Sequence, residues 1–151
     1  LGVVRPLLRD YLLKELSKRD LQPEDLALVG FSQGGVVALD MMFDLPGLGG
    51  IISYSGGFVP PKEGDPKPAN FPKVLLVHGD MDMVLPYVYF LDAKKHLEDM
   101  GLQPHTLTCS GLGHSIDDEG LKMGNAFLKE VFDQPQSVIY MKQEEEDSDG
   151  E

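Results

Sequence analysis

The sequence predicts an α/β fold in which a parallel sheet is flanked by helices. Short apolar runs recur at spacings of about 20 to 30 residues. Segments with a helical spacing of apolar residues lie between those runs, and strand–helix alternation is typical of parallel sheets. With 151 residues, of which 42% are hydrophobic, the chain is long enough to form one packed core.

The first expected element is an amphipathic helix that ends near Lys18. Its apolar residues recur at three- and four-residue steps, as one face of a helix requires. A turn over residues 22–25 leads to a continuous apolar run over residues 26–31, which is typical of a buried parallel strand. The apolar residues of the helix are Val3, Val4, Leu7, Leu8, Tyr11, Leu12 and Leu16.

The rest of the chain continues this alternation. The second helix should stop at residues 45–47, where Leu-Pro-Gly interrupts it. The Gly- and Pro-rich segment 56–72 has no expected secondary structure, and a loop of this length usually binds a ligand or forms a lid. We expect helices over residues 33–43, 87–100 and 117–132, and strands over residues 50–55, 74–78 and 104–109. The apolar face expected for the last helix consists of Leu121, Phe127, Leu128 and Val131.

The charge balance argues against a nucleic-acid partner. The chain has 13 basic and 25 acidic residues, for a net charge of -12, whereas phosphate binding requires clustered Lys and Arg. Six of the last eight residues are acidic, and such a run cannot bury apolar surface. We therefore expect residues 1–135 to form the folded domain and residues 136–151 to form a disordered acidic tail.

The single cysteine, Cys109, excludes an intrachain disulfide and fits a cytoplasmic location. No run approaches the roughly 18 apolar residues of a membrane span. The chain begins with Leu1 rather than Met, so we expect the natural start and any targeting signal to lie upstream.

The segment 30–34, Gly-Phe-Ser-Gln-Gly, fits the pattern G-x-S-x-G between the first strand and the second helix. In such a turn the serine occupies a strained conformation and its hydroxyl points outward, as a nucleophile requires. The backbone N–H of Gln33 would donate to a developing oxyanion at the positive end of the helix. A plain Gly-Ser turn is the alternative, but the strand–helix setting favours Ser32 as a nucleophile.

A serine nucleophile needs a base, and four histidines are available. His114 follows the last strand in a Gly-rich loop, where a mobile and exposed base is expected. His96 lies in an expected helix and His105 opens a strand, so both are interpreted as surface or packing residues. His78 ends a strand and is expected to brace the turn that follows it.

The acid should follow the preceding strand, because the triad order in such folds is Ser, then Asp or Glu, then His. The segment His78-Gly79-Asp80-Met81-Asp82 offers Asp80 and Asp82, and the local sequence does not choose between them. The acids at 117–119 follow the histidine and are better interpreted as first-turn residues of the last helix.

Three other interpretations of these residues are weaker. A cation site at His78, Asp80 and Asp82 lacks a second ligand cluster, so no metal is expected. Cys109 has no adjacent base or cation and is interpreted as a small buried hydrophobe. The apolar residues Met81, Met83 and Leu85 either line an acyl pocket or pack in the core.

Three sequence blocks together resemble the phospholipase/carboxylesterase family of α/β-hydrolases, which includes the acyl-protein thioesterases. They are G-F-S-Q-G-G at 30–35, H-G-D-M-D-M-V-L-P at 78–86 and G-L-G-H-S at 111–115, within a similarity that covers roughly residues 3 to 133. The resemblance assigns the acid to the second aspartate of H-G-x-x-D, which is Asp82. Ser32 and His114 carry over directly.

The resemblance also implies that the front of the α/β-hydrolase fold is missing, so that residues 1–135 form a partial domain. In the family, opening strands and an H-G-x-G oxyanion loop come first, and nothing in residues 1–20 resembles them. Strand–helix units of about 30 residues suggest that roughly 60 to 90 residues are absent. One of the two oxyanion donors comes from that loop, so Gln33 would supply only the other.

The activity implied is hydrolysis of carboxylic esters or thioesters, such as short acyl esters, lysophospholipids or acyl-protein thioesters, without a cofactor. The alternatives are an inactive remnant or interaction module that keeps the motif, and a serine peptidase with the same order of Ser, Asp and His. The expected partners are a small-molecule or lipid substrate, and either a second copy in a homodimer or the missing N-terminal segment.

Overall fold

The computed structural model describes residues 1–133, in which strands and helices alternate as the sequence predicts. The helix expected over residues 33–43 is α-helical as far as Asp40 and then tightens into a 3₁₀ turn. The expected acidic tail, residues 136–151, lies outside the described residues. The elements are α1 (Val4–Lys18), η1 (Pro23–Asp25), β1 (Ala27–Phe31), α2 (Gln33–Asp40), η2 (Met41–Phe43), β2 (Gly50–Tyr54), β3 (Lys73–Gly79), α3 (Val88–Asp99), β4 (His105–Cys109) and α4 (Asp118–Phe132).

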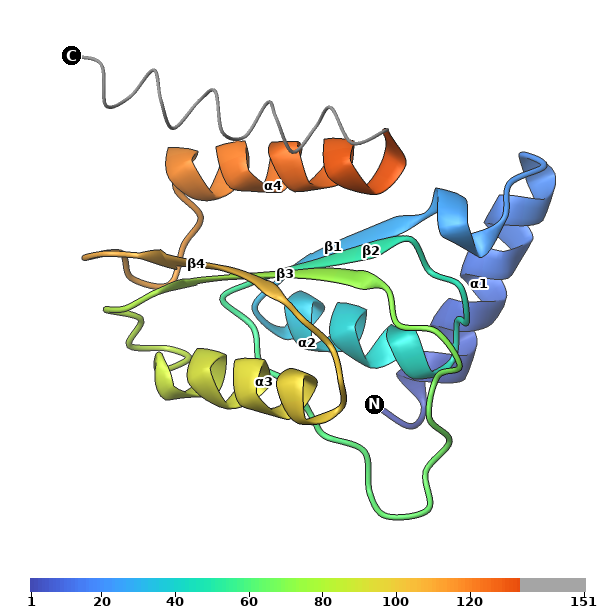
Figure 1. Cartoon of the computed structure of the whole chain (residues 1–151), viewed down its shortest axis with the longest axis horizontal. Helices are drawn as coiled ribbons and strands as arrows, with labels where there is room; N and C mark the ends of the chain where they lie inside the picture. Colours follow the sequence, from blue (N-terminus) through green and yellow to red (C-terminus); the bar gives the residue numbers. More distant parts are fainter. Residues whose placement is uncertain (134–151) are drawn as a thin grey trace.

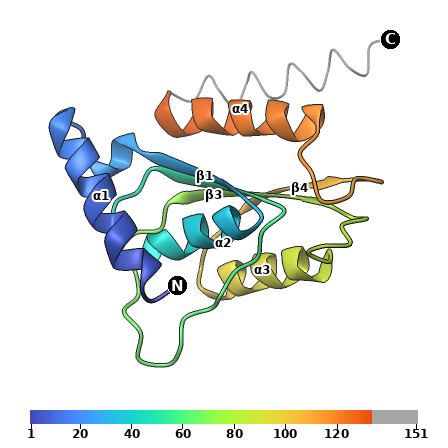
Figure 2. The same cartoon turned by 180° about the vertical axis from the view of Figure 1, so that it is seen from behind.

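The four strands form one parallel sheet in the order β1-β2-β3-β4, which confirms the predicted sheet. In the register, Phe31 lies opposite Tyr54, Tyr54 opposite Val77, and Gly79 opposite Cys109. Helix α4 covers one face of the sheet, α2 and α3 cover the other, and α1 stands beside the β1 end (Figures 1 and 2). Because all three strand pairs are parallel, the carboxyl ends of the four strands lie at one edge of the sheet.

Two apolar clusters hold these layers together, one on each face of the sheet. Ile51 and Leu76 pack with residues of α2 and α3, whereas their neighbours Ile52 and Leu75 pack with Phe127 of α4. This alternation follows from the period of two in a strand. All five residues of β2 are buried, as expected for an inner parallel strand covered on both faces.

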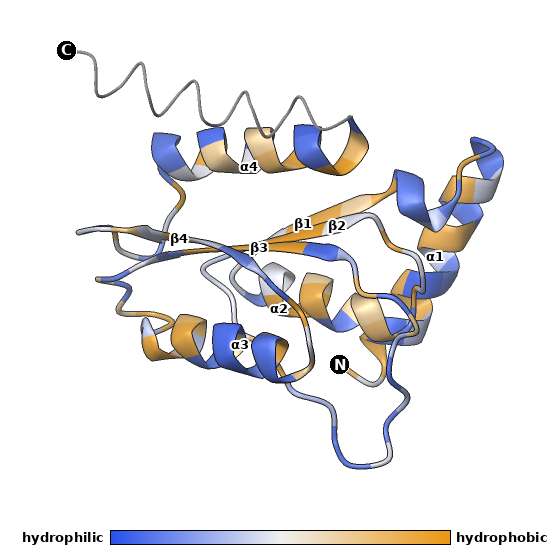
Figure 3. Ribbon diagram, viewed as in Figure 1, coloured by the Kyte–Doolittle hydropathy of each residue, from blue (hydrophilic) through white to orange (hydrophobic). Residues whose placement is uncertain are grey.

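Strand β1 was expected to be buried because of its apolar run, and that expectation was wrong. It is an edge strand of the described sheet, so its apolar side chains are not fully covered. Val29 is 56% exposed and Phe31 is 42% exposed, and Leu121 of α4 is also exposed beside them. Together with Tyr54 they line an open groove of about 400 Å³. Figure 3 shows the hydrophobic character of β1 along this edge. Leu121, which was expected on the apolar face of the last helix, lies on this groove and is left exposed.

The apolar face of α1 is also covered only in part. Leu16 is buried and Leu8 and Leu12 pack against the core. The exposed apolar residues of this face are Val3, Val4, Leu7 and Tyr11. Among residues 1–133, no helix combines the length and hydrophobicity that a membrane crossing would need.

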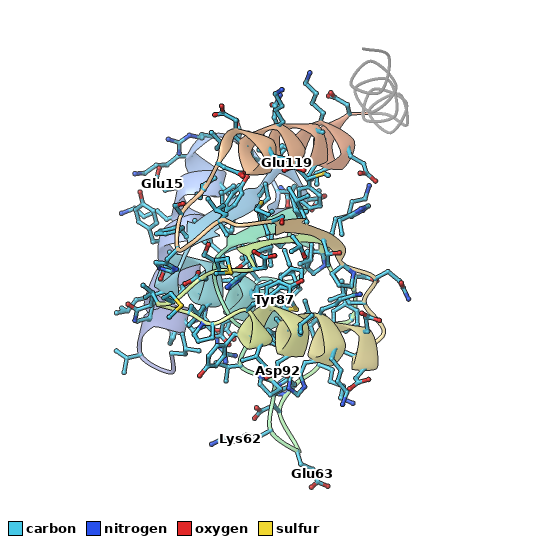
Figure 4. All side chains as sticks on the ribbon, turned by 90° about the vertical axis from the view of Figure 1, so that its left-hand side faces the viewer. Glu15, Lys62, Glu63, Tyr87, Asp92 and Glu119 are labelled. Atoms are coloured by element: carbon cyan, nitrogen blue, oxygen red, sulfur yellow. The ribbon has the colours of Figure 1, made fainter. Side chains whose placement is uncertain are left out.

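The long loop that follows β2 runs beneath the helices on the α2 and α3 face. Its Phe58 stacks on Phe43, the last residue of η2, with ring centroids 6.3 Å apart. Residues 59–62 line a groove of about 450 Å³ with Arg5 and Asp44, and Lys62 and Glu63 mark a tip that projects away from the sheet (Figure 4). This part of the loop lies at the end of α2 opposite Ser32.

Candidate active site

The loops that follow β1, β3 and β4 meet at one edge of the sheet because the strands are parallel. Figure 4 looks onto this edge, with Tyr87 near the start of α3 and Glu119 near the start of α4. The three loops carry Ser32, Asp82 and His114, the residues that the sequence proposes as nucleophile, acid and base. The fold therefore brings all three together from distant parts of the chain.

Ser32 lies in the turn between β1 and α2 in a conformation that is unusual for a non-glycine residue. Its φ is 58° and its ψ is -121°, which places the backbone in a strained region. The Ser32 N–H donates to the carbonyl of Tyr54 at 2.8 Å, and the Ser32 carbonyl accepts from Gly35 at 3.0 Å. One of these bonds ties the strained turn to β2 and the other ties it to α2.

Two glycines allow this turn to be tight. A Cβ at Gly30 would collide with the backbone of Gly34, and a Cβ at Gly35 would collide with the Oγ of Ser53. By contrast, a Cβ at Gly34 would meet no atom within 4 Å. The close approach of strand and helix therefore depends on Gly30 and Gly35 rather than on both glycines of G-x-S-x-G.

The three candidate side chains form one continuous chain of hydrogen bonds. The Oγ of Ser32 lies 3.0 Å from Nε2 of His114, and Nδ1 of His114 lies 2.7 Å from Oδ2 of Asp82. Since an ionised carboxylate only accepts, Nδ1 carries the hydrogen and Nε2 is left to accept from the serine hydroxyl. This is the tautomer in which a histidine can take a proton from a serine.

Asp82 is buried and fully supplied with donors. Its Oδ1 accepts from the N–H groups of Val84 at 2.9 Å and Leu85 at 2.8 Å, and its Oδ2 faces His114. Burial alone would raise the pKa of Asp82, but the hydrogen bonds from His114, Leu85 and Val84 together hold that pKa below its usual value. The carboxyl group is therefore ionised at neutral pH and oriented toward the histidine.

Asp80, the other acid candidate, joins the two loops instead of facing the histidine. Its Oδ1 accepts from the N–H of Gly111 at 2.7 Å, and the N–H of Met81 donates to the carbonyl of Leu112 at 3.0 Å. A Cβ at Gly79 would collide with the carbonyl oxygen of Leu112, so the loop that carries the histidine crosses directly over a glycine. Asp80 thus fixes the acid loop to the histidine loop.

Phe31 is a site residue that the sequence reasoning missed. Its ring lies 4.9 Å from the ring of His114, measured between centroids and tilted by 41°. The ring therefore packs against the base and limits its movement. Its position inside the G-x-S-x-G segment was the available signal, because a residue next to the serine must end at the same edge of the sheet.

The N–H of Gln33, which the sequence predicts as an oxyanion donor, lies at the start of α2 beside Ser32. Gln33 opens α2, where the first N–H groups of a helix have no partner within it. Among the described residues no acceptor takes this N–H. It lies next to Ser32 at the positive end of the helix, which favours a developing negative charge.

The other candidates lie outside this hydrogen-bonded chain. His96 is half-buried beside Phe58, and His105 is exposed with its ring against Phe127, so the interpretation of both as packing or surface residues is confirmed. His78 is buried at the end of β3 behind Asp82. Within residues 1–133, no three His, Cys, Asp or Glu side chains converge as metal ligands would.

Cys109 is a buried thiol without a nucleophilic environment. It is 1% exposed, and its Sγ lies 3.6 Å from Oδ1 of Asp117. Burial, followed by the nearby carboxylate of Asp117, raises the pKa of this thiol to about 12. The interpretation of Cys109 as a small buried hydrophobe is confirmed, because a thiol with this pKa is not ionised at neutral pH.

A parallel sheet with a serine on a strained strand–helix turn, and with acid and histidine on the loops that follow later strands, defines the α/β-hydrolase class. The sequence profile described as phospholipase/carboxylesterase matches residues 7–132. The chain belongs to this family, as the sequence blocks predict.

Sequence relatives carry esterase names. The chain is 26% identical over 125 residues to acyl-protein thioesterase 1 homolog 1 of Dictyostelium discoideum, covering 78% of this chain and 53% of the relative. It is 27% identical over 104 residues to esterase YpfH of Escherichia coli, covering 68% of this chain and 44% of the relative. The chain thus spans about half the length of these curated relatives.

Solved structures give the same assignment of fold. The chain superimposes on the crystal structure of esterase PE8 with a TM-score of 0.80 and 37% identity, over 87% of this chain and 61% of that one. It superimposes on SOBER1 of Arabidopsis thaliana with a TM-score of 0.74 and 27% identity, over 83% of this chain and 61% of that one. The predicted α/β-hydrolase fold is therefore confirmed.

Proposed function

We propose that this protein hydrolyses carboxylic esters or thioesters through an acyl-enzyme on Ser32. The observation that carries the proposal is the continuous hydrogen-bonded chain from Ser32 through His114 to Asp82, with distances of 3.0 Å and 2.7 Å. Nucleophile and base lie within the reach that proton transfer requires. The names of the relatives, which are esterases and an acyl-protein thioesterase, support the choice of substrate class.

In the first half of the reaction, Nε2 of His114 takes the hydroxyl proton while Oγ of Ser32 attacks the acyl carbonyl carbon. The carbonyl oxygen becomes an oxyanion, to which the N–H of Gln33 donates. When the intermediate collapses, the bond to the leaving oxygen or sulfur breaks and His114 returns its proton to that atom. The products of this step are an alcohol or thiol and an ester on Ser32.

In the second half, His114 takes a proton from water and the resulting hydroxide attacks the acyl-enzyme carbonyl. The bond to Oγ of Ser32 breaks, and the proton on His114 passes to that oxygen. A free carboxylic acid leaves and the enzyme is restored, so no cofactor enters the balance. Asp82 stays ionised throughout, because its pKa is held low, and it stabilises the imidazolium that forms twice.

An apolar acyl group fits the surroundings of the site. Met81 is 59% exposed, Met83 is 87% exposed and Val84 is 69% exposed, and all three belong to the turn that carries Asp82. Apolar side chains exposed beside a catalytic centre favour an apolar substrate. We also propose a cytoplasmic location, since the single cysteine of these 151 residues has no partner among them for a disulfide.

Hydrolysis of p-nitrophenyl acetate by the full-length protein that carries this chain tests the proposal. We expect Ser32→Ala to lower kcat by about 10⁴-fold or more, because the nucleophile is lost. Cys109→Ala is the matched control and should keep the activity. Peptide p-nitroanilides should not be cleaved, and cleavage of them in preference to esters would indicate a peptidase instead. Equal esterase activity in the protein and in Ser32→Ala would refute the proposal.

A further inference from the structure

A second histidine lies behind the acid of the candidate triad. His78, the last residue but one of β3, is 2% exposed and is one of the few buried polar residues among those described. Its ring packs near Tyr87, at 6.1 Å between centroids, and near Phe90, at 5.9 Å. Burial of an imidazole is unfavourable unless its nitrogen atoms find partners, so the contacts of this ring explain why it is there.

The Nε2 atom of His78 faces two oxygen atoms. It lies 2.8 Å from the carbonyl of Leu85 and 3.4 Å from Oδ2 of Asp82. A carbonyl and an ionised carboxylate both accept, so this nitrogen carries the hydrogen. The shorter contact is a hydrogen bond, and the longer one is an electrostatic contact between the same N–H and the carboxylate.

These contacts close the turn that carries Asp82. The N–H of Leu85 donates to Oδ1 of Asp82, while the carbonyl of Leu85 accepts from His78. Leu85 is therefore held on both sides of its backbone, once by the acid and once by the histidine. Because β3 and α3 fix His78, the turn between them cannot shift without breaking one of these bonds.

We infer that His78 is a positioning residue that keeps Asp82 aimed at His114. Oδ2 of Asp82 contacts both histidines, with Nδ1 of His114 at 2.7 Å and Nε2 of His78 at 3.4 Å. The side chain of His78 is 1% exposed, against 17% for His114, so His78 takes no proton from substrate and acts only through the acid. This inference rests on the proposed function of Ser32.

The test is the rate at which a fluorophosphonate labels Ser32 in the full-length protein, measured per folded molecule. His78→Leu removes the N–H, and we expect labelling to slow by about 10- to 100-fold, the loss typical of a displaced catalytic group. His78→Gln places an amide N–H where Nε2 stood and should restore most of the rate. His96→Leu, at a half-buried histidine outside the site, is the matched control and should label like the unaltered protein.

A double-variant cycle separates positioning from general loss of structure. If His78 acts through Asp82, His78→Leu should cause no further loss when Asp82→Asn is already present, because interacting residues are not additive. If His78→Leu does not fold, His78→Asn takes its place, since its shorter amide cannot reach Leu85. Full labelling of His78→Leu, no recovery with Gln, or an equal loss in the Asp82→Asn background would each overturn the inference.

The same experiment keeps the two proposals apart. Labelling of the unaltered protein that persists in Ser32→Ala would refute the proposed function. Labelling that is lost in Ser32→Ala but unchanged in His78→Leu would leave the proposed function standing and refute only the role of His78.

Discussion

The carboxylate of Asp82 makes four polar contacts at the candidate site. Two backbone N–H groups donate to Oδ1, while His114 and His78 both face Oδ2. The hydrogen bonds from His114, Leu85 and Val84 stabilise the ionised form enough to outweigh the effect of burial, so the pKa of Asp82 in the folded protein lies below its usual value. A lowered pKa links the stability of the fold to pH.

The sign of this linkage gives a prediction for Asp82→Asn. A group with a lowered folded-state pKa adds stability above its unfolded pKa, and that contribution disappears as pH falls through the folded-state pKa. We expect the unaltered protein to have a larger free energy of unfolding than Asp82→Asn at pH 7 and pH 5. This difference should shrink as the pH falls through the lowered folded-state pKa of Asp82. Urea denaturation at these pH values measures it. A difference that grows on acidification would contradict the assignment.

Asp80 and Asp82 illustrate what the sequence leaves open at the residue scale. Both follow β3, and their spacing alone favours neither as the acid. The choice depends on the path of the loop after β4, which crosses over Gly79 and offers the N–H of Gly111 to Asp80. That path is a long-range contact, so only the fold, or a resemblance to proteins that share it, distinguishes the two acids.

At the level of elements, the turn between β1 and α2 gives a matched pair of variants. Gly35→Ala places a methyl group against the Oγ of Ser53 and the carbonyl of Gly30, where the backbone cannot yield. We expect it to lower the free energy of unfolding by about 1–3 kcal/mol. Gly34→Ala meets open space and should change stability by no more than about 1 kcal/mol.

Thermal or urea denaturation of the two variants decides this point. If both variants are destabilised equally, contact with Ser53 is not the cause, and the prediction is contradicted. The pattern G-x-S-x-G predicts a tight turn, but it does not say which glycine the neighbouring strand contacts. That contact comes from β2, which lies about 20 residues further along the chain.

The elements themselves were largely predictable from the sequence. Strands β2 and β3 contain the apolar pairs and runs Ile51-Ile52 and Val74–Val77, which are buried because both faces of these strands are covered. The helical segment after β1 ends at Phe43, just before the stop signal at residues 45–47. Short-range features such as these are encoded locally. The tightening at Met41 into a 3₁₀ turn was not predicted, since helix ends often change in this way without a sequence signal.

At the scale of the whole molecule, β1 leaves one edge of the sheet unpaired within the described residues. An exposed edge strand with apolar side chains is a site for pairing with another chain. We therefore expect these 151 residues, expressed alone, to bind a hydrophobic dye and to self-associate. Val29→Lys, which places a charge on the edge, should reduce both.

Val59→Lys is the matched control, because Val59 is 51% exposed, close to the 56% of Val29, but lies in the loop after β2. Dye fluorescence and analytical ultracentrifugation measure the two effects. If Val29→Lys and Val59→Lys behave alike, the β1 edge is not the surface responsible.

Exposed apolar residues on the helices show what the sequence could not predict for the whole molecule. Helical periodicity correctly identified apolar faces on α1 and α4, but it cannot say what covers each residue of a face. Tyr11 and Leu121 belong to such faces and are exposed. Because the relatives are about twice as long as the matched region, residues outside these 151 are the natural candidates to cover them.

The central claim is that Ser32 is the nucleophile of a serine hydrolase, and the most direct test is the site of covalent modification. A fluorophosphonate loses its fluoride when a serine Oγ attacks phosphorus, so the adduct marks the activated residue. Peptide mapping by mass spectrometry after treatment of the full-length protein should place the adduct on Ser32. It should be absent in Ser32→Ala and retained in Cys109→Ala. A folded, full-length protein that remains unmodified, or is modified elsewhere, would contradict the claim.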